Sequence, residues 1–261
     1  MVPLPMQPAK AYLEEEHRTA RAMQARNVLK SLVITASSVS YLSGLGLLSL
    51  LNCNPARALP PEKFSSPMEQ PKDIGNETGL AYTKSSAYKK SFEKAVREAR
   101  DFCKTYKKKH PNAKNLAIVS DIDETLLDNR GLFNEVDEFS WPEFIKWTKK
   151  AEAPNLEPTA RFLKWARKNG FSIFLITGRP EKLRSCTIMN LVRNGVSYDG
   201  LYMRPEMKRK NSAIELKTGV RKNLEDMGFV IVVNIGDQVS DLVGGHALDC
   251  QKLPNKMYFV K

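Results

Sequence analysis

Four aspartates stand at the ends of apolar runs, in two pairs. Asp121 and Asp123 follow the first run, and Asp237 and Asp241 follow the last. The alternation of the first pair directs both side chains to one side of an extended chain. The second pair, four residues apart, shares one face if a helical turn follows. Carboxylates gathered in this way repel one another unless a hard cation neutralises them, and oxygen ligands of this kind favour Mg²⁺.

A third apolar run also ends in polar residues, namely Thr177, Gly178 and Arg179. An aspartate at a strand end often only caps a helix or a turn, and for any one of these residues alone that alternative stays open. Ligands bind at the carboxyl ends of the strands in open α/β sheets. Polar groups at three such ends therefore favour one shared site.

The elements that must position these residues alternate along the chain. Apolar runs typical of strands buried on both faces span 116–120, 171–176 and 229–235. Helical patterns span 159–168, 181–193 and 213–227. A repeated order of strand, helix and strand predicts an α/β fold with right-handed crossovers. We expect a Rossmann-like three-layer sandwich with a parallel sheet.

Two further segments flank the first strand. Residues 85–109 repeat apolar side chains every three or four positions, which predicts an amphipathic helix. Residues 133–158 are too many for a simple crossover, and we interpret them as a small helical cap. The cap carries the aromatic residues Phe139, Trp141, Phe144 and Trp147. Their spacing favours packing of a cap helix on the core, and stacking on a nucleobase or an aryl group is the alternative.

The N-terminus has the parts of a secretory signal peptide. An uncharged run at 31–51 follows basic residues and leads to a small-residue triplet at 56–58. We therefore expect a signal peptide over 1–58 and an exported chain, whether periplasmic, extracellular or membrane-anchored. An uncleaved anchor is one alternative, because about twenty apolar residues cross a bilayer. Lipidation at Cys53 is another.

The remainder divides into a linker and one domain. Residues 59–83 contain four prolines and two glycines, and we interpret them as a linker or an arm. We expect the folded domain over 84–261, with the cap as an insertion.

The amino-acid composition excludes several classes of protein and of site. With 42% apolar and 27% charged residues among 261, the chain is neither mainly disordered nor a multi-span membrane protein. The net charge of +12 suits an anionic partner without selecting one. The four cysteines lack the close spacing of a zinc site or of a dense disulfide framework.

Four motifs follow one another along the chain: DIDETLLDN at 121–129, ITGRP at 176–180, LKTGVRKNLE at 216–225 and IGDQVSDL at 235–242. In this order they resemble the haloacid dehalogenase (HAD) superfamily, and within it the subfamily III acid phosphatases of class B/C type, which include plant vegetative storage proteins. The resemblance extends from about Tyr82 to the C-terminus. It implies a Mg²⁺-dependent phosphomonoesterase that acts on small phosphomonoesters.

The resemblance also implies catalytic roles. Asp121 would attack phosphorus and form an aspartyl phosphate. Asp123 would protonate the leaving alcohol and then deprotonate the hydrolytic water. Thr177 and Lys217 would stabilise the charge on the phosphoryl oxygens.

Binding roles follow from the same resemblance. Mg²⁺ would be held by the carboxylates of Asp121, Asp237 and Asp241 and by the backbone carbonyl oxygen of Asp123. The substrate would contact Gly178, Arg179 and Arg221, and pairing with an acidic surface residue is the alternative for each arginine. We expect Thr125 to fix Asp123 and Asn129 to orient the loop beyond the first motif.

A small phosphomonoester is thus the expected partner. We interpret the basic runs at 107–109 and 208–210 as solvated faces, and we expect no nucleic-acid binding. Membrane contact would come only through an uncleaved signal or a lipid anchor, and the sequence leaves the oligomeric state open. A weakly active storage or binding protein on the same scaffold is one alternative function, and a phosphotransferase is another.

Overall fold

The computed structural model describes residues 76–136, 139–206 and 212–260. Internal contacts divide the chain into two units, 1–53 and 54–261, and all described residues belong to the second unit. The expected signal peptide or anchor and most of the expected linker lie outside the described residues. None of the helices within the described ranges has the length and apolarity that a bilayer crossing requires.

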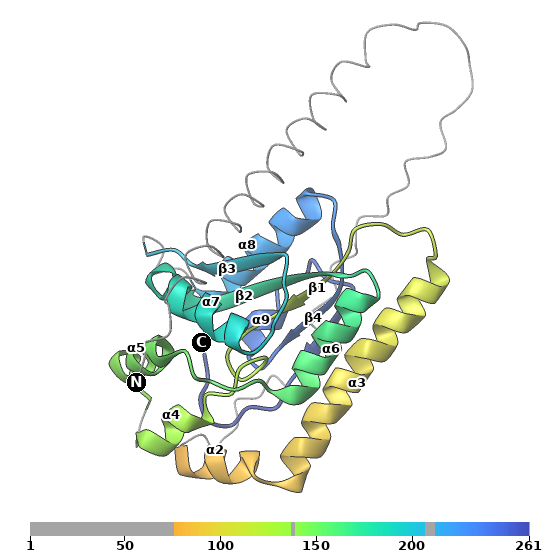
Figure 1. Cartoon of the computed structure of the whole chain (residues 1–261). Helices are drawn as coiled ribbons and strands as arrows, with labels where there is room; N and C mark the ends of the chain where they lie inside the picture. Colours follow the sequence, from red (N-terminus) through yellow and green to blue (C-terminus); the bar gives the residue numbers. More distant parts are fainter. Residues whose placement is uncertain (1–75, 137–138, 207–211, 261) are drawn as a thin grey trace, which may run out of the picture. The chain divides into compact units, whose positions relative to one another are not determined.

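Five parallel strands form one sheet in the order β3-β2-β1-β4-β5 (Figure 1). The central three are those that the apolar runs predict, namely β1 (Leu116–Ser120), β2 (Ser172–Pro180) and β4 (Val230–Gly236). The edge strands β3 (Gly200–Arg204) and β5 (Asp249–Lys252) were not predicted. Every residue of β5 is half-buried. An edge strand of this kind lacks the apolar run that reveals a central strand.

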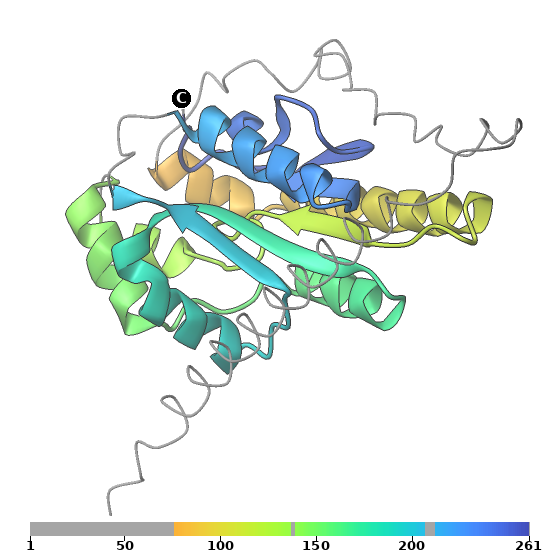
Figure 2. The same ribbon diagram turned by 90° about the horizontal axis from the view of Figure 1, so that it is seen from above.

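Helices cover both faces of the sheet (Figure 2). On one face α3 (Ser86–Lys109) and α6 (Glu157–Lys168) lie side by side, and α8 (Ala213–Asp226) lies against the other. The core has the same two parts, because Ile118 of β1 packs in the cluster with α3 and α6, whereas Val119 packs in the cluster with α8. The predicted three-layer α/β fold is therefore confirmed.

The remaining helices are short. They are α2 (Asn76–Thr83), α4 (Arg130–Glu135), α5 (Trp141–Lys150), η2 (Glu181–Leu183), α7 (Arg184–Arg193) and α9 (Val239–Leu242). The expected cap thus contains α5 and the second half of α4. Ser140 begins α5, since its hydroxyl accepts a hydrogen bond from the backbone N–H of Glu143.

Helix α2 occupies the last eight residues of the segment that we expected to be a linker or an arm. Its sequence has no amphipathic pattern, so tertiary contact stabilises it. Gly79 lies so close to the C-terminal segment that a Cβ atom there would be 2.6 Å from the Cα of Met257. Only glycine permits this approach, and the close contact holds α2 against residues 256 and 257.

Candidate active site

Neighbouring strands bring three aspartates together. Asp121 follows β1 and Asp237 follows β4, and these two strands pair in the sheet. Asp241 lies on α9, four residues further on. One carboxylate oxygen from each residue lies within 4.8 Å of those of the other two, and all three residues are buried. Gly236 permits this, because a Cβ atom there would be 2.4 Å from the Cβ of Asp241. The spacing predicts four aspartates at this edge, and three of them meet in the cluster.

Lys217 of α8 reaches into this cluster. Its ammonium nitrogen is 2.6 Å from Oδ1 of Asp121 and 2.5 Å from Oδ1 of Asp241. All three side chains are buried. Burial alone lowers the pKa of Lys217, but the two carboxylates outweigh it and raise this pKa above its ordinary value. Lys217 is therefore a charged lysine shared by two aspartates.

One lysine does not balance three buried carboxylates. Burial, followed by the charge of Asp241, raises the pKa of Asp237 to about 6. Burial also raises the pKa of Asp121 well above its ordinary value, against the opposing effect of Lys217. Burial is the main cause of both shifts, and the negative charge of the neighbouring carboxylates adds to it. An all-oxygen cluster with this excess charge fits a hard divalent cation.

Asp123 points to a different partner. Arg179 donates to both of its carboxylate oxygens, with Nε at 3.0 and 3.1 Å and Nη2 at 2.7 Å from Oδ1. Asn129 adds a hydrogen bond of 2.9 Å. Burial raises the pKa of Asp123, but Arg179 and Asn129 outweigh it and the pKa is lowered. The side chain of Asp123 is therefore not in the carboxylate cluster, and its contribution through a carbonyl oxygen stays a prediction.

Two of the polar residues that follow the apolar run at 171–176, Thr177 and Arg179, contact Asp123 rather than the cluster. The hydroxyl of Thr177 is 3.4 Å from Oδ2 of Asp123 and accepts a hydrogen bond from the backbone N–H of Arg179. Thr177 is fully buried, and its contact with a phosphoryl group stays a prediction. Gly178 lines the pocket, as does Arg179. The guanidinium of Arg179 is already bonded to Asp123 and to Thr187.

The structure does not bring Arg221, an expected substrate contact, to the pocket. Its side chain is fully buried and is not among the residues that line the pocket. The guanidinium donates to the backbone carbonyls of Asp241, Val243 and Gly245. This loop contains two glycines at positive φ. Arg221 therefore holds the turn that follows α9.

The hydrogen-bond partners of Thr125 and Asn129 differ from those expected. Thr125 does not fix Asp123, because its hydroxyl lies 3.2 Å from Oδ1 of Asp237. Asn129 bonds Asp123 instead, and its carbonyl oxygen accepts the indole N–H of Trp147 at 2.9 Å. The cap is thus connected to Asp123 through Asn129.

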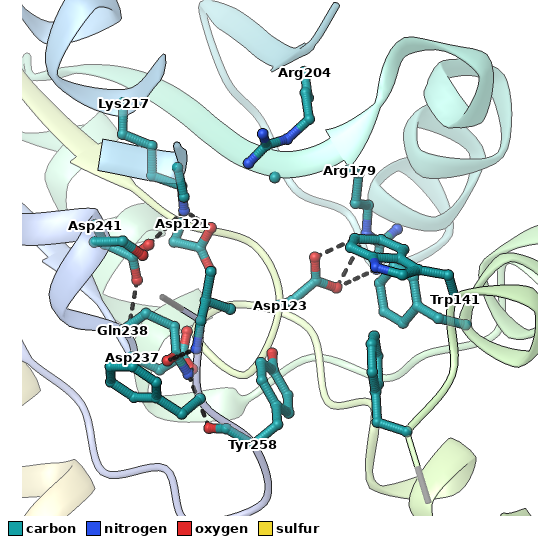
Figure 3. A pocket seen from close by; sticks show the side chains of 17 residues that line it. Asp121, Asp123, Trp141, Arg179, Arg204, Lys217, Asp237, Gln238, Asp241 and Tyr258 are labelled. Atoms are coloured by element: carbon teal, nitrogen blue, oxygen red, sulfur yellow. Dashed lines mark hydrogen bonds and ion pairs between the residues drawn. The ribbon is translucent and has the colours of Figure 1, made fainter. Parts of the chain in front are cut away.

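A cavity of about 320 Å³ opens over both aspartates of the first motif (Figure 3). Asp121, Lys217 and Asp241 lie on one side of it, and Asp123, Arg179 and Trp141 lie on the other. Its aromatic wall consists of Phe139, Trp141, Phe144, Tyr258 and Phe259. Trp141 is 55% exposed and Phe139 is 38% exposed. These two side chains face the pocket more than the core, so packing alone, the interpretation favoured from sequence, does not account for them.

Sequence reasoning missed several residues of the site. Gln238, Asn255 and Tyr258 each make hydrogen bonds with acidic groups around the pocket, and Arg204 of β3 lines it. Gln238 could have been found, since it follows Asp237 within a recognised motif. Nothing in the sequence pairs Asn255 or Tyr258 with residues 18 and 134 positions away.

Several named proteins are similar in sequence to part of this chain. Acid phosphatase 1 of Solanum lycopersicum is 36% identical over 148 residues, which are 54% of this chain and 58% of that protein. A stem 31 kDa glycoprotein of Glycine max is 31% identical, over 56% of this chain and 61% of that protein. Vegetative storage protein 1 of Arabidopsis thaliana is 29% identical, over 54% of each. The chain therefore spans little more than half the length of the curated relatives it matches.

A solved structure and a family model both support the family resemblance that the four motifs indicate. The class C acid phosphatase from Bacillus anthracis aligns with a TM-score of 0.57 and 20% identity, over 70% of this chain and 85% of that one, and so has a similar fold. A family model described as HAD superfamily, subfamily IIIB (acid phosphatase) matches residues 43–261. With a match over this length, the chain belongs to the subfamily IIIB acid phosphatase family of the HAD superfamily.

Proposed function

We propose that this protein is an exported, Mg²⁺-dependent acid phosphatase that hydrolyses small phosphomonoesters through an aspartyl phosphate. One observation carries the proposal. Asp121 lies at the pocket between a charged lysine and two further carboxylates, while Asp123, two residues later, has an arginine of its own. The two aspartates therefore have separate environments: a cation would balance the excess carboxylates around Asp121 and keep this nucleophile ionised, whereas Asp123 is paired with Arg179.

The first half-reaction transfers the phosphoryl group to the protein. A carboxylate oxygen of Asp121 attacks phosphorus, and the bond from phosphorus to the leaving oxygen breaks in line. The protonated Asp123 gives its proton to that oxygen, so that an alcohol departs. Lys217 lies 2.6 Å from the nucleophile and offsets negative charge on the transferring group.

The second half-reaction releases phosphate. Asp123, now ionised, takes a proton from a water molecule, whose oxygen attacks the phosphorus of the aspartyl phosphate. The acyl phosphate bond breaks, so that Asp121 returns as a carboxylate and inorganic phosphate leaves. Arg179 supports this step because it stabilises the ionised form of Asp123. Thr177 and Gly178 are proposed to donate hydrogen bonds to the phosphoryl oxygens.

The carboxylates of Asp121, Asp237 and Asp241 would hold the cation, together with the carbonyl oxygen of Asp123. When bound, Mg²⁺ supplies positive charge that lets an anionic nucleophile approach an anionic phosphate. Mg²⁺ is the proposed ion because the cluster offers only oxygen atoms. The raised pKa values of Asp121 and Asp237 support this choice, since a cation would keep both groups ionised.

The leaving group would lie against the aromatic wall. Trp141 is exposed on the side of the pocket that also holds Asp123, the proposed proton donor, and its ring packs against that of Phe139. Planar leaving groups such as aryl alcohols or nucleosides fit this surface. Export is supported by the expected signal peptide and by the description of two soybean relatives as glycoproteins.

A storage protein with little activity is the rival function, because an Arabidopsis relative carries the name vegetative storage protein. The aspartate at position 121 and its contact with Lys217 favour an enzyme over this alternative. A phosphotransferase shares the first half-reaction and would pass the phosphoryl group to an alcohol instead of water.

One experiment tests the proposal. Phosphate release is measured from nucleotides, sugar phosphates and aryl phosphates, with Mg²⁺ and with EDTA, for the wild type and for Asp121→Asn. We expect Asp121→Asn to abolish turnover, because the amide has nearly the same shape and is a far poorer nucleophile. Asp226→Asn, which changes an exposed aspartate of α8, is the matched control and should retain full activity.

Three results would contradict the proposal. Equal turnover by the wild type and Asp121→Asn would exclude the covalent mechanism, and full activity in EDTA would exclude the cation. If the wild-type chain released phosphate from none of these substrates, the result would favour the storage protein. Adding glycerol as an acceptor separates the phosphotransferase, which would form glycerol phosphate at the expense of free phosphate.

A further inference from the structure

The end of the chain lies in the active site. Residues 253–260, here called the C-terminal strap, follow β5, and Tyr258, Phe259 and Val260 line the pocket. Figure 3 shows Tyr258 beside Asp237 and Gln238, below the gap between the two aspartates of the first motif. The strap therefore contacts both the carboxylate cluster and the loop that follows β1.

Asn255 of the strap holds Asp237. Its amide nitrogen donates to Oδ2 of Asp237 at 2.7 Å, and both residues are buried. The Nε2 atom of Gln238 donates to the same oxygen at 2.6 Å. Among the described residues, the other oxygen, Oδ1, receives just the longer contact of 3.2 Å from Thr125. Two amide donors thus fix Oδ2 of Asp237. Oδ1 is therefore the oxygen that is more available to a cation.

Tyr258 of the strap holds the loop of the first motif. Its hydroxyl donates to Oε2 of Glu124, and the backbone N–H of Asn129 donates to Oε1 at 2.9 Å. Glu124 has a φ of +53°, a left-handed conformation that a residue with a side chain rarely adopts. Two hydrogen bonds to its buried carboxyl stabilise that conformation. Since Glu124 directly follows Asp123, they also fix the backbone of Asp123.

The strap is itself held in place by contacts with α2, with two phenylalanine rings and with Gln238. The backbone at Lys256 and Met257 packs against Gly79 of α2. The ring of Tyr258 stacks on Phe133 and Phe139, with centroids 5.7 and 5.8 Å away. The backbone N–H of Val260 donates to Oε1 of Gln238 at 3.0 Å. These contacts give Asn255 and Tyr258 the fixed positions that they need in order to orient other groups.

We propose that Asn255 and Tyr258 are positioning residues, through which the C-terminal strap orients Asp237 and the backbone of Asp123 for the divalent cation. This inference rests on the proposed Mg²⁺-dependent function. Groups that bond the ligands of a metal raise its affinity because they fix the ligand orientation before binding, and their loss typically weakens metal binding by about 10- to 100-fold.

The test is calorimetric titration of Mg²⁺ into the full chain at 25 °C, for the wild type, Asn255→Leu and Tyr258→Phe. Leucine has a similar volume to asparagine but no donor, and phenylalanine keeps the ring in the aromatic wall without the hydroxyl. We expect the dissociation constant for Mg²⁺ to rise by at least about tenfold in Asn255→Leu. We expect a smaller rise, by at least about threefold, in Tyr258→Phe, which acts through Glu124.

A second measurement separates positioning from folding. If the strap orients the cation site, the Mg²⁺ concentration for half-maximal phosphate release should rise by the same factor as the dissociation constant, and kcat at saturating Mg²⁺ should return towards the wild-type value. Asn223→Leu and Tyr106→Phe are the controls, because they make the same replacements on exposed or half-buried faces of α8 and α3. Both should bind Mg²⁺ as the wild type does.

The outcomes are distinguishable. Unchanged Mg²⁺ affinity in both variants, even with a lower melting temperature, would overturn the inference and leave the proposed function intact. If Asn255→Leu does not fold, Tyr258→Phe alone decides, since it removes one oxygen atom. A wild-type chain that binds no Mg²⁺ would overturn the proposed function and the inference together.

Discussion

The two aspartates of the first motif are separated by one residue, yet they lie in opposite electrostatic surroundings. Asp121 shares Lys217 with Asp241 and lies within reach of Asp237, so its half of the site carries more negative than positive charge. Asp123 has Arg179 to itself. We call the first group the inner half, and Asp123, Arg179 and the aromatic wall the outer half.

The difference between the halves is one of charge balance. In the inner half, burial and crowding raise the pKa of Asp121 and Asp237, so the ionised cluster requires an added cation. In the outer half, one guanidinium matches one carboxylate, and the pKa of Asp123 is lowered. The inner half is therefore suited to hold a metal and a phosphoryl group, and the outer half to move a proton at the leaving group.

The largest effect is expected from Lys217→Met. Removing this ammonium leaves Asp121 and Asp241 buried without their shared cation, and breaking a buried pair typically costs about 3–5 kcal/mol. The unfolding free energy in EDTA, measured by urea denaturation, should fall by about that amount. Phosphate release should fall by about 10²–10³-fold, the usual cost of removing one group that stabilises the transition state.

Lys222→Met is the matched control, because Lys222 lies on the same helix with an exposed side chain. It should leave the unfolding free energy nearly unchanged, because an exposed surface ion pair contributes little to stability. If Lys217→Met proved as stable as the control, the inner half would not depend on its lysine for charge, and the contrast between the halves would be lost.

Replacement of Arg179 by glutamine should shift a pH profile. Burial raises the pKa of Asp123 and Arg179 lowers it, so loss of the arginine should raise this pKa. A general acid works only while protonated, and the rate therefore falls as pH rises through its pKa. In Arg179→Gln, the fall of kcat/KM on the alkaline side should move to higher pH for an alkyl phosphate, whose leaving group needs a proton.

An aryl phosphate with a good leaving group supplies the internal control, since its departure needs little protonation and its profile should move less. Arg161→Gln, at an exposed position of α6, should leave both profiles unchanged. An identical profile for the wild type and Arg179→Gln on the alkyl phosphate would mean that Asp123 does not supply the proton.

The inner half could be predicted from the sequence almost completely. Asp121 and Asp237 end the apolar strands β1 and β4, and a parallel sheet necessarily brings the ends of paired strands to one edge. Asp241 follows Asp237 at the spacing of one helical turn. Local patterns thus determine the position of each carboxylate, and the resemblance to the HAD superfamily identified Lys217.

The contacts within the outer half and the strap could not be predicted, because long-range packing brings their residues together. Lys217 and Arg221 are both buried on one face of α8, and spacing does not tell which meets carboxylates and which meets the carbonyls of a loop. Asn255 lies beyond β5, an edge strand without an apolar run. Trp141 has the spacing of a packing residue, and only the fold shows that it is exposed at the pocket.

The smallest effect is expected from Trp141→Ala, which tests whether the outer half recognises the leaving group. The ring of Trp141 meets those of Phe139 and Phe144 edge-on, at 5.7 and 5.8 Å. A ring contact with substrate is worth about 0.5–1.5 kcal/mol, so KM for an aryl phosphate should rise about two- to tenfold. Glycerol phosphate, which has no ring, should show an unchanged KM, and Trp141→Phe should restore most of the loss. An equal rise in KM for both substrates would mean that Trp141 only stabilises the cap, and that the leaving group is recognised elsewhere.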